Sequence, residues 1–428
     1  MTQHRRHRVA VVLVTHNGAR WLPHFFHSLP AALRAPMGPG TAPDEADASQ
    51  SPKNAVPAAA VTASGGGAPE VASGAYEQGA VGDSWLALWG EDEPATTGIV
   101  EDLQIDPVLI AVDTGSVDDS VELAQRAGFT VLSAESSTPF GRAASLARSY
   151  LEQQQIEVDW LWLVHDDMAP LPGCLPRLLL AAQETSAAVC GPLVVGWAQP
   201  PLLLERGIRL TGSGRRVLGV DPGEVDQGQH DDEPATPTLA VSSTAMLVRV
   251  DAWDALNGYD PAFPMSGDDI DFCRRAHRAG FEVVVVASAK VRHAQALTRN
   301  RRPESRSTRP VRDLRLAALH LHLAHATGWA FPLVAARLSI GTGVRAVARL
   351  LRRDFAGARD EIDGWLRFIA HPSRLVASRH RVAATAVTTH RVERAYSVPL
   401  REQGRHWLRS VVHLLEIITR VGERPHAQ

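Results

Sequence analysis

The sequence predicts an α/β protein with a doubly wound, mostly parallel sheet flanked by helices and followed by a C-terminal helical extension. Short apolar runs, mostly rich in β-branched residues, recur along the chain, helical signals lie between them, and polar residues follow several runs directly. The runs cover residues 9–15, 107–113, 129–133, 160–164 and 187–195. Continuous apolar runs of this length suit strands that are covered on both faces of a parallel sheet.

Two segments carry clear helix signals. The stretch SVDDSVELAQRAG has a helix start at Ser116, acidic residues in its first turn, and a stop at Gly128. The stretch GDDIDFCRRAHRAG opens a helix after Gly267 and ends it at Gly280. Because strand and helix signals alternate, we expect βα units rather than an all-β or all-α fold.

The chain divides by composition into two predicted domains. Residues 1–300 hold the strand and helix pattern, interrupted at 35–97 by a low-complexity insertion dominated by Ala, Gly, Ser, Pro and acidic residues. Such a segment has too little apolar surface to offset the entropy of ordering, so we expect it to be disordered. A second polar loop, 221–237, is interpreted as a solvated loop, with a mobile flap near a substrate as the alternative.

Residues 301–428 form the predicted helical extension. Arginine-rich segments alternate there with apolar residues at helical spacing. We expect the apolar residues to pack on the domain. The alternative is a basic amphipathic surface resting on an anionic membrane leaflet, which would suit an enzyme acting on a lipid-linked acceptor.

Charge and cysteine content exclude several classes of protein. The formal net charge of −3 over 428 residues gives no general affinity for nucleic acid. Cys174, Cys190 and Cys273 have neither disulfide-framework nor zinc-site spacing, which fits a reducing, cytosolic setting. The apolar run at 9–14 is too short for a signal peptide, and no uninterrupted apolar stretch of membrane-spanning length exists. We therefore expect a cytoplasmic protein, with peripheral contact at the inner face of the plasma membrane as the one membrane role considered.

Paired carboxylates follow the strand WLWLV. Asp166 and Asp167 come directly after His165, at the carboxyl end of a buried run. Ligands of α/β sheets bind at that edge. Adjacent carboxylates repel each other, so a site that keeps both usually holds a divalent cation, and oxygen ligands suit Mg²⁺ or Mn²⁺. A solvated turn is the simpler interpretation of such a pair in isolation.

Other polar groups fall at equivalent places. Thr15 and Asn17 follow the first strand in VTHNG, and Asp113 and Gly115 follow the second in VDTGS. Each segment alone could be an ordinary capped turn. A carboxylate at the position of Asp113 could also accept a hydrogen bond from a base or a ribose hydroxyl.

The segment from 241 to 294 is more specific. Asp268 and Asp269 lie in the first turn of the acidic helix, and the strand that follows ends at His293. Asp271 can pair with Arg275 four residues later, which accounts for part of the acidic cluster as helix stabilisation. One of the remaining carboxylates could serve as a general base. The preceding segment 242–246 fits either an acceptor pocket or a buried core strand.

The order of these segments resembles that of the family 2 glycosyltransferases. VTHNG and VDTGSVDDS resemble their nucleotide-binding turns, HDDM their DxD metal motif, and GDDIDFCRR their ED-x-D-L-x-x-R element. PFGRAASLA and VRHA resemble the donor-pocket segment and the strand end that carries the metal histidine. The resemblance spans about 9–294 and implies a GT-A fold and an inverting, metal-dependent, hexosyltransferase-type reaction with a nucleotide-diphospho-sugar donor.

The resemblance also implies site roles. Thr15, Asn17, Asp113, Gly115, Arg142 and Asp166 would bind the nucleotide-sugar, Asp167 and His293 would hold Mg²⁺ or Mn²⁺, and Asp269 or Asp268 would be the base, with Asp269 preferred. Two departures stand out. His165 replaces the first Asp of the DxD, so its role is left open, and Asp268 replaces the usual Glu.

A saccharide or lipid-linked saccharide acceptor in cell-envelope polysaccharide or glycolipid synthesis follows by analogy. A nucleotidyltransferase is one rival, but it would show a Gly-rich, Arg- or Lys-bearing phosphate loop that VTHNGARWL lacks. A non-catalytic nucleotide-sugar-binding or scaffold protein is the other, and the set of Asp166, Asp167, Asp269 and His293 speaks against it.

Overall fold

The computed structural model describes residues 5–34, 103–211, 216–263, 266–295, 309–326 and 328–385. All of these lie in one compact unit of the chain. The low-complexity insertion predicted at 35–97, and the last part of the extension beyond 385, fall outside the described residues. The division into domains at residue 300 stays a prediction.

The predicted strands all form. They are β1 (Arg5–Thr15), β2 (Leu103–Asp113), β3 (Thr130–Ser133), β4 (Trp160–His165) and β6 (Val189–Val195). The first two begin four residues earlier than their apolar runs, because polar residues pair with one another at the amino ends, as in the match of Arg5 with Leu103. The remaining strands are β5 (Met168–Pro170), β7 (Leu203–Glu205), β8 (Arg209–Leu210), β9 (Arg216–Val217), β10 (Thr236–Pro237), β11 (Ala245–Arg249) and β12 (Val283–His293).

The large sheet is mixed and mostly parallel, as predicted. Its strands run in the order β10-β12-β6-β11-β4-β1-β2-β3, with β5 paired to β12 and β7 to β6. The pairs β1–β2, β1–β4, β2–β3 and β6–β12 are parallel, whereas β11 is antiparallel to both of its neighbours. Of the segment 242–246, left open between a pocket and a core strand, only the last two residues lie in the buried strand β11, and residues 242–244 precede it.

The strand order reverses between β1 and β4. Moving outward from β1, the chain places β2 and β3 on one side and β4 on the other. At such a reversal the connecting segments leave in opposite directions, which opens a crevice at the carboxyl ends of the strands. The VTHNG turn after β1 and the HDDM turn after β4 both leave from this point, so the topology brings the two motifs together.

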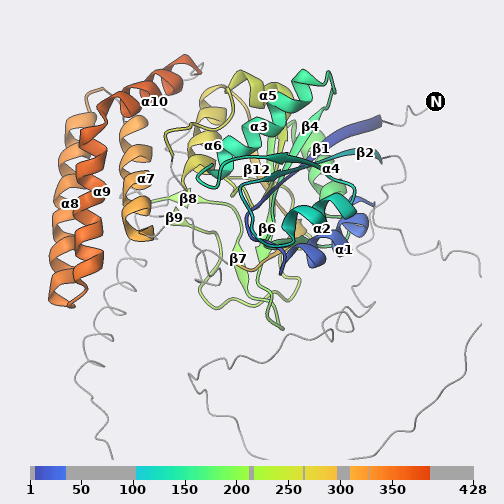
Figure 1. Ribbon diagram of the computed structural model, residues 1–428, viewed down its shortest axis with the longest axis horizontal. Helices are drawn as coiled ribbons and strands as arrows, with labels where there is room; N and C mark the ends of the chain where they lie inside the picture. The colour runs from blue at the N-terminus through green and yellow to red at the C-terminus, as the bar shows by residue number, and fades with distance from the viewer. Residues whose placement is uncertain are drawn as a thin grey trace, which may run out of the picture. The chain divides into compact units, whose positions relative to one another are not determined.

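Helices cover both faces of the sheet (Figure 1). On β1, Val9, Val11 and Leu13 pack with α1 (Leu22–Leu33) and α4 (Cys174–Thr185), while Ala10 and Val12 pack with α3 (Phe140–Gln153) and α6 (Asp268–Arg278). The alternation follows from the two-residue period of a strand. It explains why the strand sequences are apolar at every position.

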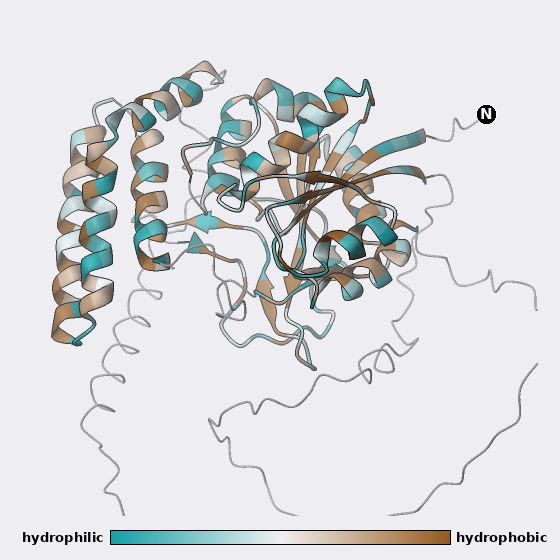
Figure 2. Ribbon diagram, viewed as in Figure 1, coloured by the Kyte–Doolittle hydropathy of each residue, from teal (hydrophilic) through white to brown (hydrophobic). Residues whose placement is uncertain are grey.

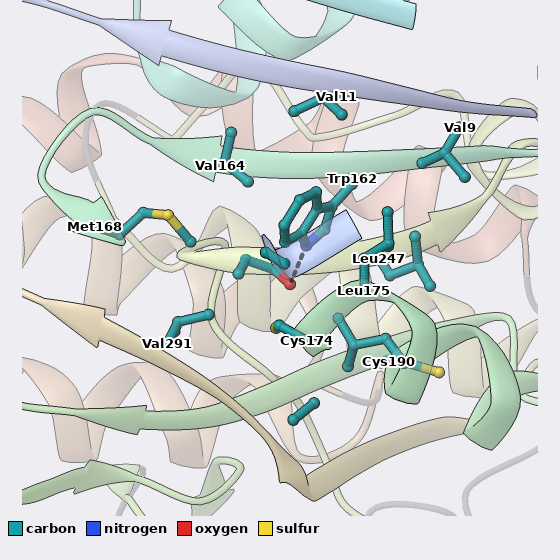
Figure 3. Close-up of a cluster of buried hydrophobic side chains, with 14 of the residues drawn as sticks. Val9, Val11, Trp162, Val164, Met168, Cys174, Leu175, Cys190, Leu247 and Val291 are labelled. Atoms are coloured by element: carbon teal, nitrogen blue, oxygen red, sulfur yellow. Dashed lines mark hydrogen bonds between the residues drawn. The ribbon is translucent and has the colours of Figure 1, made fainter. Parts of the chain in front are cut away.

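Trp162 of β4 anchors the first of these layers. Its ring is fully buried among Val164, Leu247 and Cys174, and its indole N–H donates to the carbonyl of Ala245, 3.3 Å away (Figure 3). A buried indole needs such a partner. The bond joins β4 to β11. In the described part of this sheet, β11 is inserted between β6 and β4 and is antiparallel to both, and the bond helps to fix it there.

One predicted helix start is wrong. The helix placed at Ser116 begins as α2 (Ser120–Arg126), because residues 114–119 form a turn that binds the carboxylate of Asp113. The stop at Gly128 is confirmed, and this glycine has φ +83°. The polar loop 221–237 is tied to β12 by Lys290, whose ammonium lies 2.9 Å from Asp226 and 2.6 Å from Asp231.

The C-terminal helices are α7 (Pro310–Ala324), α8 (Phe331–Leu351), α9 (Phe355–Ala370) and α10 (Pro372–Ala384), and α5 (Val250–Ala255) precedes the acidic segment. The predicted helical extension is therefore confirmed over its described part. Figure 1 shows α8 and α9 side by side. Among the described residues, α8 is the one helix long and apolar enough to cross a membrane by length and composition.

Candidate functional site

The turns after β1 and β4 are joined by Asp166. One of its carboxylate oxygens accepts hydrogen bonds from the Thr15 hydroxyl at 3.1 Å and from the backbone N–H of His16 at 2.9 Å. A Cβ on Gly18 would lie 2.5 Å from the same oxygen. Glycine is needed at position 18 because the carboxylate occupies that space. Asp166 therefore ties two motifs together, and the Thr15 side chain is fully buried in this contact.

The turns after β1 and β2 are also tied to each other. Asn17 adopts a φ of +51°, and its side-chain oxygen accepts from the N–H of Val117 at 2.8 Å. Asp113 accepts from the N–H groups of Gly115 and Ser116 at 3.1 and 3.2 Å. Five of the residues predicted to bind the nucleotide, Thr15, Asn17, Asp113, Gly115 and Asp166, thus form one connected set of turns at the carboxyl edge of the sheet.

His165, Asp167 and His293 form a cluster in which each residue offers one ligand atom within 4.8 Å of the others. The Nε2 of His293 lies 3.2 Å from the Asp167 Oδ1, and the Nδ1 of His165 lies 4.0 Å from that oxygen. Asp167 is nearly buried, and the two imidazoles are partly exposed. The side chains come from β4, the β4–β5 turn and the end of β12.

Strand pairing explains how residues 126 positions apart meet. The strand β5 pairs antiparallel with β12, which places Met168 opposite His293. The N–H of Ala294 then donates to the carbonyl of Asp167 at 2.9 Å. His165 is oriented by the Ser243 hydroxyl, 3.1 Å from its Nε2, and by the ring of Phe140, whose centroid is 4.4 Å away.

The cluster fits a divalent cation. Ligand atoms that are each bonded to one ion at about 2.1 Å lie roughly 3 to 4 Å apart, and the observed separations are close to this range. If Nδ1 of His165 faces the ion, Nε2 carries the proton and donates to Ser243. Such an outer partner fixes both the tautomer and the orientation of a metal-binding histidine.

The acidic helix α6 begins directly with Asp268, after Gly267 at φ +89°. Asp268 and Asp269 are both buried, and a favourable helix dipole acts on carboxylates at this position. Burial and the charge of Asp269 raise the pKa of Asp268 to about 7. Asp268 therefore binds a proton more readily than an ordinary aspartic acid, because a second negative charge beside a buried carboxylate is unfavourable.

Asp269 has two charged neighbours that sequence reasoning missed. A guanidinium nitrogen of Arg216, on β9, lies 3.5 Å from the Asp269 Oδ1. Glu205, at the end of β7, is partly buried, and burial together with the charge of Asp269 raises the pKa of this acid. Neither residue stands in a recognisable motif, since each is positioned only by the pairing of short strands.

Two chains of contacts connect the histidine cluster with the acidic helix. In the first, Phe140 packs on His165, and the next residue, Gly141, lies so close to Asp268 that a Cβ there would be 3.0 Å from its carboxylate. In the second, Ser243 contacts His165, while the N–H of Ser242 donates to Glu205 at 3.1 Å. The predicted metal and base residues thus lie in one neighbourhood.

The rest of the acidic element is structural. Asp271 and Arg275 form a fully buried ion pair of 2.8 Å, which confirms the predicted i,i+4 pair. Arg275 also donates to the carbonyls of Leu256 and Gly258. The second oxygen of Asp271 accepts from His325 at 2.7 Å, a residue at the end of α7 that the sequence did not single out.

The structure brings most of the predicted site residues together. Arg142 differs from the others, because its side chain is exposed on the first turn of α3 and contributes no hydrogen bond among those described. His165, left open by the sequence, belongs to the cluster. A histidine in place of an acidic motif residue is itself a possible metal ligand, and this was the signal available in the sequence.

Comparison with known proteins finds a family model that matches part of the chain, including most of this site. Residues 113–312 match the model described as "Glycosyltransferase like family 2". An N-acetylglucosaminyl-diphospho-decaprenol L-rhamnosyltransferase of Mycobacterium tuberculosis is 30% identical over 155 residues, which are 34% of this chain and 50% of the relative. The galactofuranosyltransferase GlfT1 of Mycolicibacterium smegmatis is 26% identical over 214 residues, 48% of this chain and 64% of the relative.

The chain thus spans between half and two thirds of the curated relatives it matches. Among solved structures, S. aureus TarS in complex with UDP-GlcNAc is similar over 91% of both chains, with 14% identity and a TM-score of 0.43. The family match covers β3, β4, β6, β11 and β12 and includes the histidine cluster and the acidic helix, whereas the VTHNG turn lies before it.

Proposed function

Since this chain carries a family 2-like glycosyltransferase domain, we propose that it transfers a sugar from a nucleotide-diphospho-sugar to a hydroxyl acceptor with inversion at the anomeric carbon. The proposal is carried by one observation: the cluster of His165, Asp167 and His293 lies close to the first residues of α6. A site for this reaction needs a positive centre for the leaving diphosphate and a base for the acceptor, and these two groups of residues would supply them.

The donor would bind at the connected turns. Thr15, Asn17, Asp113, Gly115 and Asp166 lie where the strand order reverses, which is the usual ligand position in open α/β sheets. In the described structure the side chains of Asn17 and Asp113 hold neighbouring backbone groups, so they would shape the pocket as well as contact the nucleotide. Arg142 is exposed at the start of α3, from where it would reach the sugar or the diphosphate.

The metal would be held by Asp167, His293 and His165. A divalent cation bound there offsets the negative charge that develops on the departing nucleoside diphosphate. Of the two cations expected, Mg²⁺ and Mn²⁺, we favour Mn²⁺, because two of the three protein ligands are imidazoles and Mg²⁺ prefers oxygen. Ser243 would hold His165 in the tautomer that leaves Nδ1 facing the ion.

The base would be Asp269. It accepts the proton of the attacking hydroxyl while the new bond to the anomeric carbon forms and the bond to the diphosphate breaks, leaving the electron pair on the departing group. Arg216, 3.5 Å from Asp269, would limit where the carboxylate can turn. Asp268 faces Gly141 and the buried Tyr259 ring, so its role would be to support the neighbouring acid rather than to meet the acceptor.

The names of the relatives support a proposal about the substrate class. The names of the mycobacterial relatives describe sugar transfer, in one case to a lipid-linked diphosphate saccharide. We extend this to the present chain as synthesis of a cell-envelope polysaccharide or glycolipid on the cytoplasmic side of the membrane. A nucleotidyltransferase or a non-catalytic nucleotide-sugar-binding protein remains the competing proposal.

The decisive experiment combines donor screening with paired variants. The purified chain is screened with a panel of nucleotide sugars for thermal stabilisation that requires Mn²⁺, and the best donor is then tested for metal-dependent transfer or slow hydrolysis. Asp269→Asn should abolish transfer and hydrolysis while leaving donor-dependent stabilisation nearly intact. Asp268→Asn is the matched control, because it changes the adjacent carboxyl in the same helical turn and should retain measurable turnover.

The outcomes separate the rival proposals. Stabilisation by nucleotide sugars without any turnover in the wild-type chain would favour a binding protein. Release of pyrophosphate from a nucleoside triphosphate and a sugar phosphate would favour a nucleotidyltransferase. Near-normal transfer by Asp269→Asn would remove Asp269 from the role of base.

A further inference from the structure

The helix α8 exposes an apolar stripe. Leu333, Ile340, Val344, Val347 and Leu351 recur at steps of seven, four, three and four residues, which places them on one face of the helix. All five are exposed, from 55% for Val347 to 82% for Leu351. A stripe of this kind normally packs against another element. Within the described residues nothing covers it.

The adjacent helix α9 repeats the pattern. Phe355, Ile362, Leu366 and Ile369 recur at steps of seven, four and three residues and are all exposed. Three of them line a shallow groove of about 480 Å³ together with Leu350 of α8. Figure 2 shows apolar segments between polar ones along both helices. We call these two stripes with their groove the α8–α9 apolar face.

The two helices do not need this face to hold each other. Leu338 and Thr342 of α8 are buried on the side of the helix away from the stripe, as are Gly357 and Gly364 of α9. A second contact is electrostatic and is made by the buried Glu361, which binds Arg315 at 2.7 Å and Arg345 at 3.1 Å. The apolar face is therefore surplus to the packing of the described helices.

The exposed charge around the face is mainly positive. Five arginines are exposed on α8, α9 and the short turn between them, at positions 337, 352, 353, 359 and 367, and the turn also holds Asp354, whose 42% exposed side chain pairs with Arg349. The acidic residues of α9, Asp360, Glu361 and Asp363, are buried or half-buried, and each is paired with an arginine. The exposed surface thus combines large apolar side chains with positive charge.

We propose that the α8–α9 apolar face docks on the surface of an anionic lipid bilayer, with its apolar side chains among the acyl chains and its arginines at the phosphate groups. The apolar side chains match the acyl region of such a bilayer, and the flanking arginines match its anionic headgroups. The proposal concerns binding alone and does not depend on sugar transfer. From the sequence, we expected the apolar residues of the C-terminal helices to pack on the domain. The proposal gives the exposed ones a different role.

Docking along the surface fits the contacts better than crossing the bilayer. Although α8 has the length and composition of a membrane span, its Arg345 and Arg349 lie 3.1 and 3.6 Å from Glu361 of α9. A spanning orientation would carry this ion cluster into hydrocarbon, where charged groups are costly. An orientation in the membrane plane keeps the cluster on the side away from the lipid.

The test is vesicle cosedimentation of the full-length chain. Vesicles of phosphatidylcholine are compared with vesicles of equal parts phosphatidylcholine and phosphatidylglycerol, at low and at high salt. We expect binding to the anionic vesicles that falls with salt, because exposed charges are screened. Ile362→Glu and Val347→Glu should each lower the partition coefficient about tenfold or more, from the lost burial of an apolar side chain.

Two matched controls separate the face from general effects. Leu146→Glu changes a helical residue of similar exposure on α3, 39% against 41% for Ile362, and should leave binding unchanged. The double variant Arg352→Gln and Arg353→Gln should weaken binding to anionic vesicles about thirtyfold, at about 1 kcal/mol per arginine. Arg6→Gln with Arg126→Gln removes two exposed arginines of the sheet domain and should have little effect.

Several results would overturn the proposal. Equal binding to neutral and anionic vesicles would contradict the proposed attraction between the arginines and the lipid phosphates. Vesicle binding that persists at high salt would indicate an inserted helix. A wild-type dimer that Val347→Glu dissociates would make the face an interface between copies of the chain. A large loss of thermal stability in Val347→Glu, with vesicle binding unchanged, would mean that another segment of the chain covers the face.

Discussion

The imidazole of His325, at the end of α7, donates a 2.7 Å hydrogen bond to the carboxylate of Asp271, three residues after the first residue of α6. Both side chains are fully buried. The bond attaches the C-terminal helices to the helix that carries the proposed base. The orientation of Asp269 therefore depends on residues more than 50 positions away, in the predicted extension.

This relationship predicts a specific pH dependence of stability. Burial lowers the pKa of His325 to about 4, from an ordinary value of 6.5, although Asp271 acts in the opposite direction. Between these values the unfolded chain binds the proton and the folded chain does not, so stability is complete above about pH 6.5 and falls as the pH drops toward 4. The loss should approach about 3 kcal/mol.

Urea unfolding at several pH values would measure this loss. His325→Gln cannot titrate, and its unfolding free energy should change less than that of the wild type between about pH 6.5 and pH 4. The pKa of Asp271 is held well below its usual range by Arg275 and His325 against the effect of burial, so this acid acts at lower pH. Parallel pH profiles for wild type and variant would contradict the assignment.

The buried ion pair in α6 should be costly to break. Asp271→Ala leaves the Arg275 charge without its carboxylate, so we expect a loss of about 3 to 5 kcal/mol in unfolding free energy. Removing both charges with Asp271→Leu and Arg275→Met should be less harmful than the single change. Thermal or urea unfolding would measure both, and a double variant worse than the sum of its parts would argue against the pairing.

Gly18 should tolerate no side chain. In Gly18→Ala the new Cβ would lie 2.5 Å from Asp166 Oδ2, so the carboxylate must leave Thr15 and His16. We expect a stability loss of about 1 to 3 kcal/mol together with weaker donor binding. The control is Gly343→Ala in α8, where the Cβ meets nothing within 4 Å and the helix should gain about 0.5 to 1 kcal/mol.

His165 and Ser243 should act together in cation binding. Calorimetry of the nucleotide-free chain should show tighter binding of Mn²⁺ than of Mg²⁺, and His165→Ala should remove most of this preference. Ser243→Ala should weaken Mn²⁺ binding about 10- to 100-fold, as outer partners of metal ligands do. The exposed His380→Ala is the control, and an unchanged Mn²⁺ affinity in His165→Ala would exclude this histidine as a ligand.

Local patterns in the sequence predicted much of the architecture. The runs at 9–15 and 160–164 became strands within one or a few residues, because a strand buried on both faces must be apolar at every position, and this constraint is visible locally. The helix start at Ser116 was misplaced for a related reason. The polar residues that signal a helix cap also serve a turn. Here the Ser116 hydroxyl accepts a hydrogen bond from the N–H of Asn17, and the Asp113 carboxylate binds the N–H groups of Gly115 and Ser116.

The site was predicted in part. Asp167 and His293 could be named because their residue types and order are informative, and the structure places them 3.2 Å apart. Glu205 and Arg216 could not be named, since they lie on strands of two or three residues with no periodic signal. His325 was equally invisible, because a histidine near a helix end has many ordinary roles.

The sequence by itself determined the elements, the acidic and histidine side chains available for chemistry, and the apolar stripes of the C-terminal helices. Tertiary structure decided which of these groups share a site and which face remains exposed. The pairing of β5 with β12 brought His293 to Asp167, and the packing of α7 brought His325 to Asp271. Periodicity is a local property that the chain records directly, whereas such contacts between distant residues depend on strand order and helix packing.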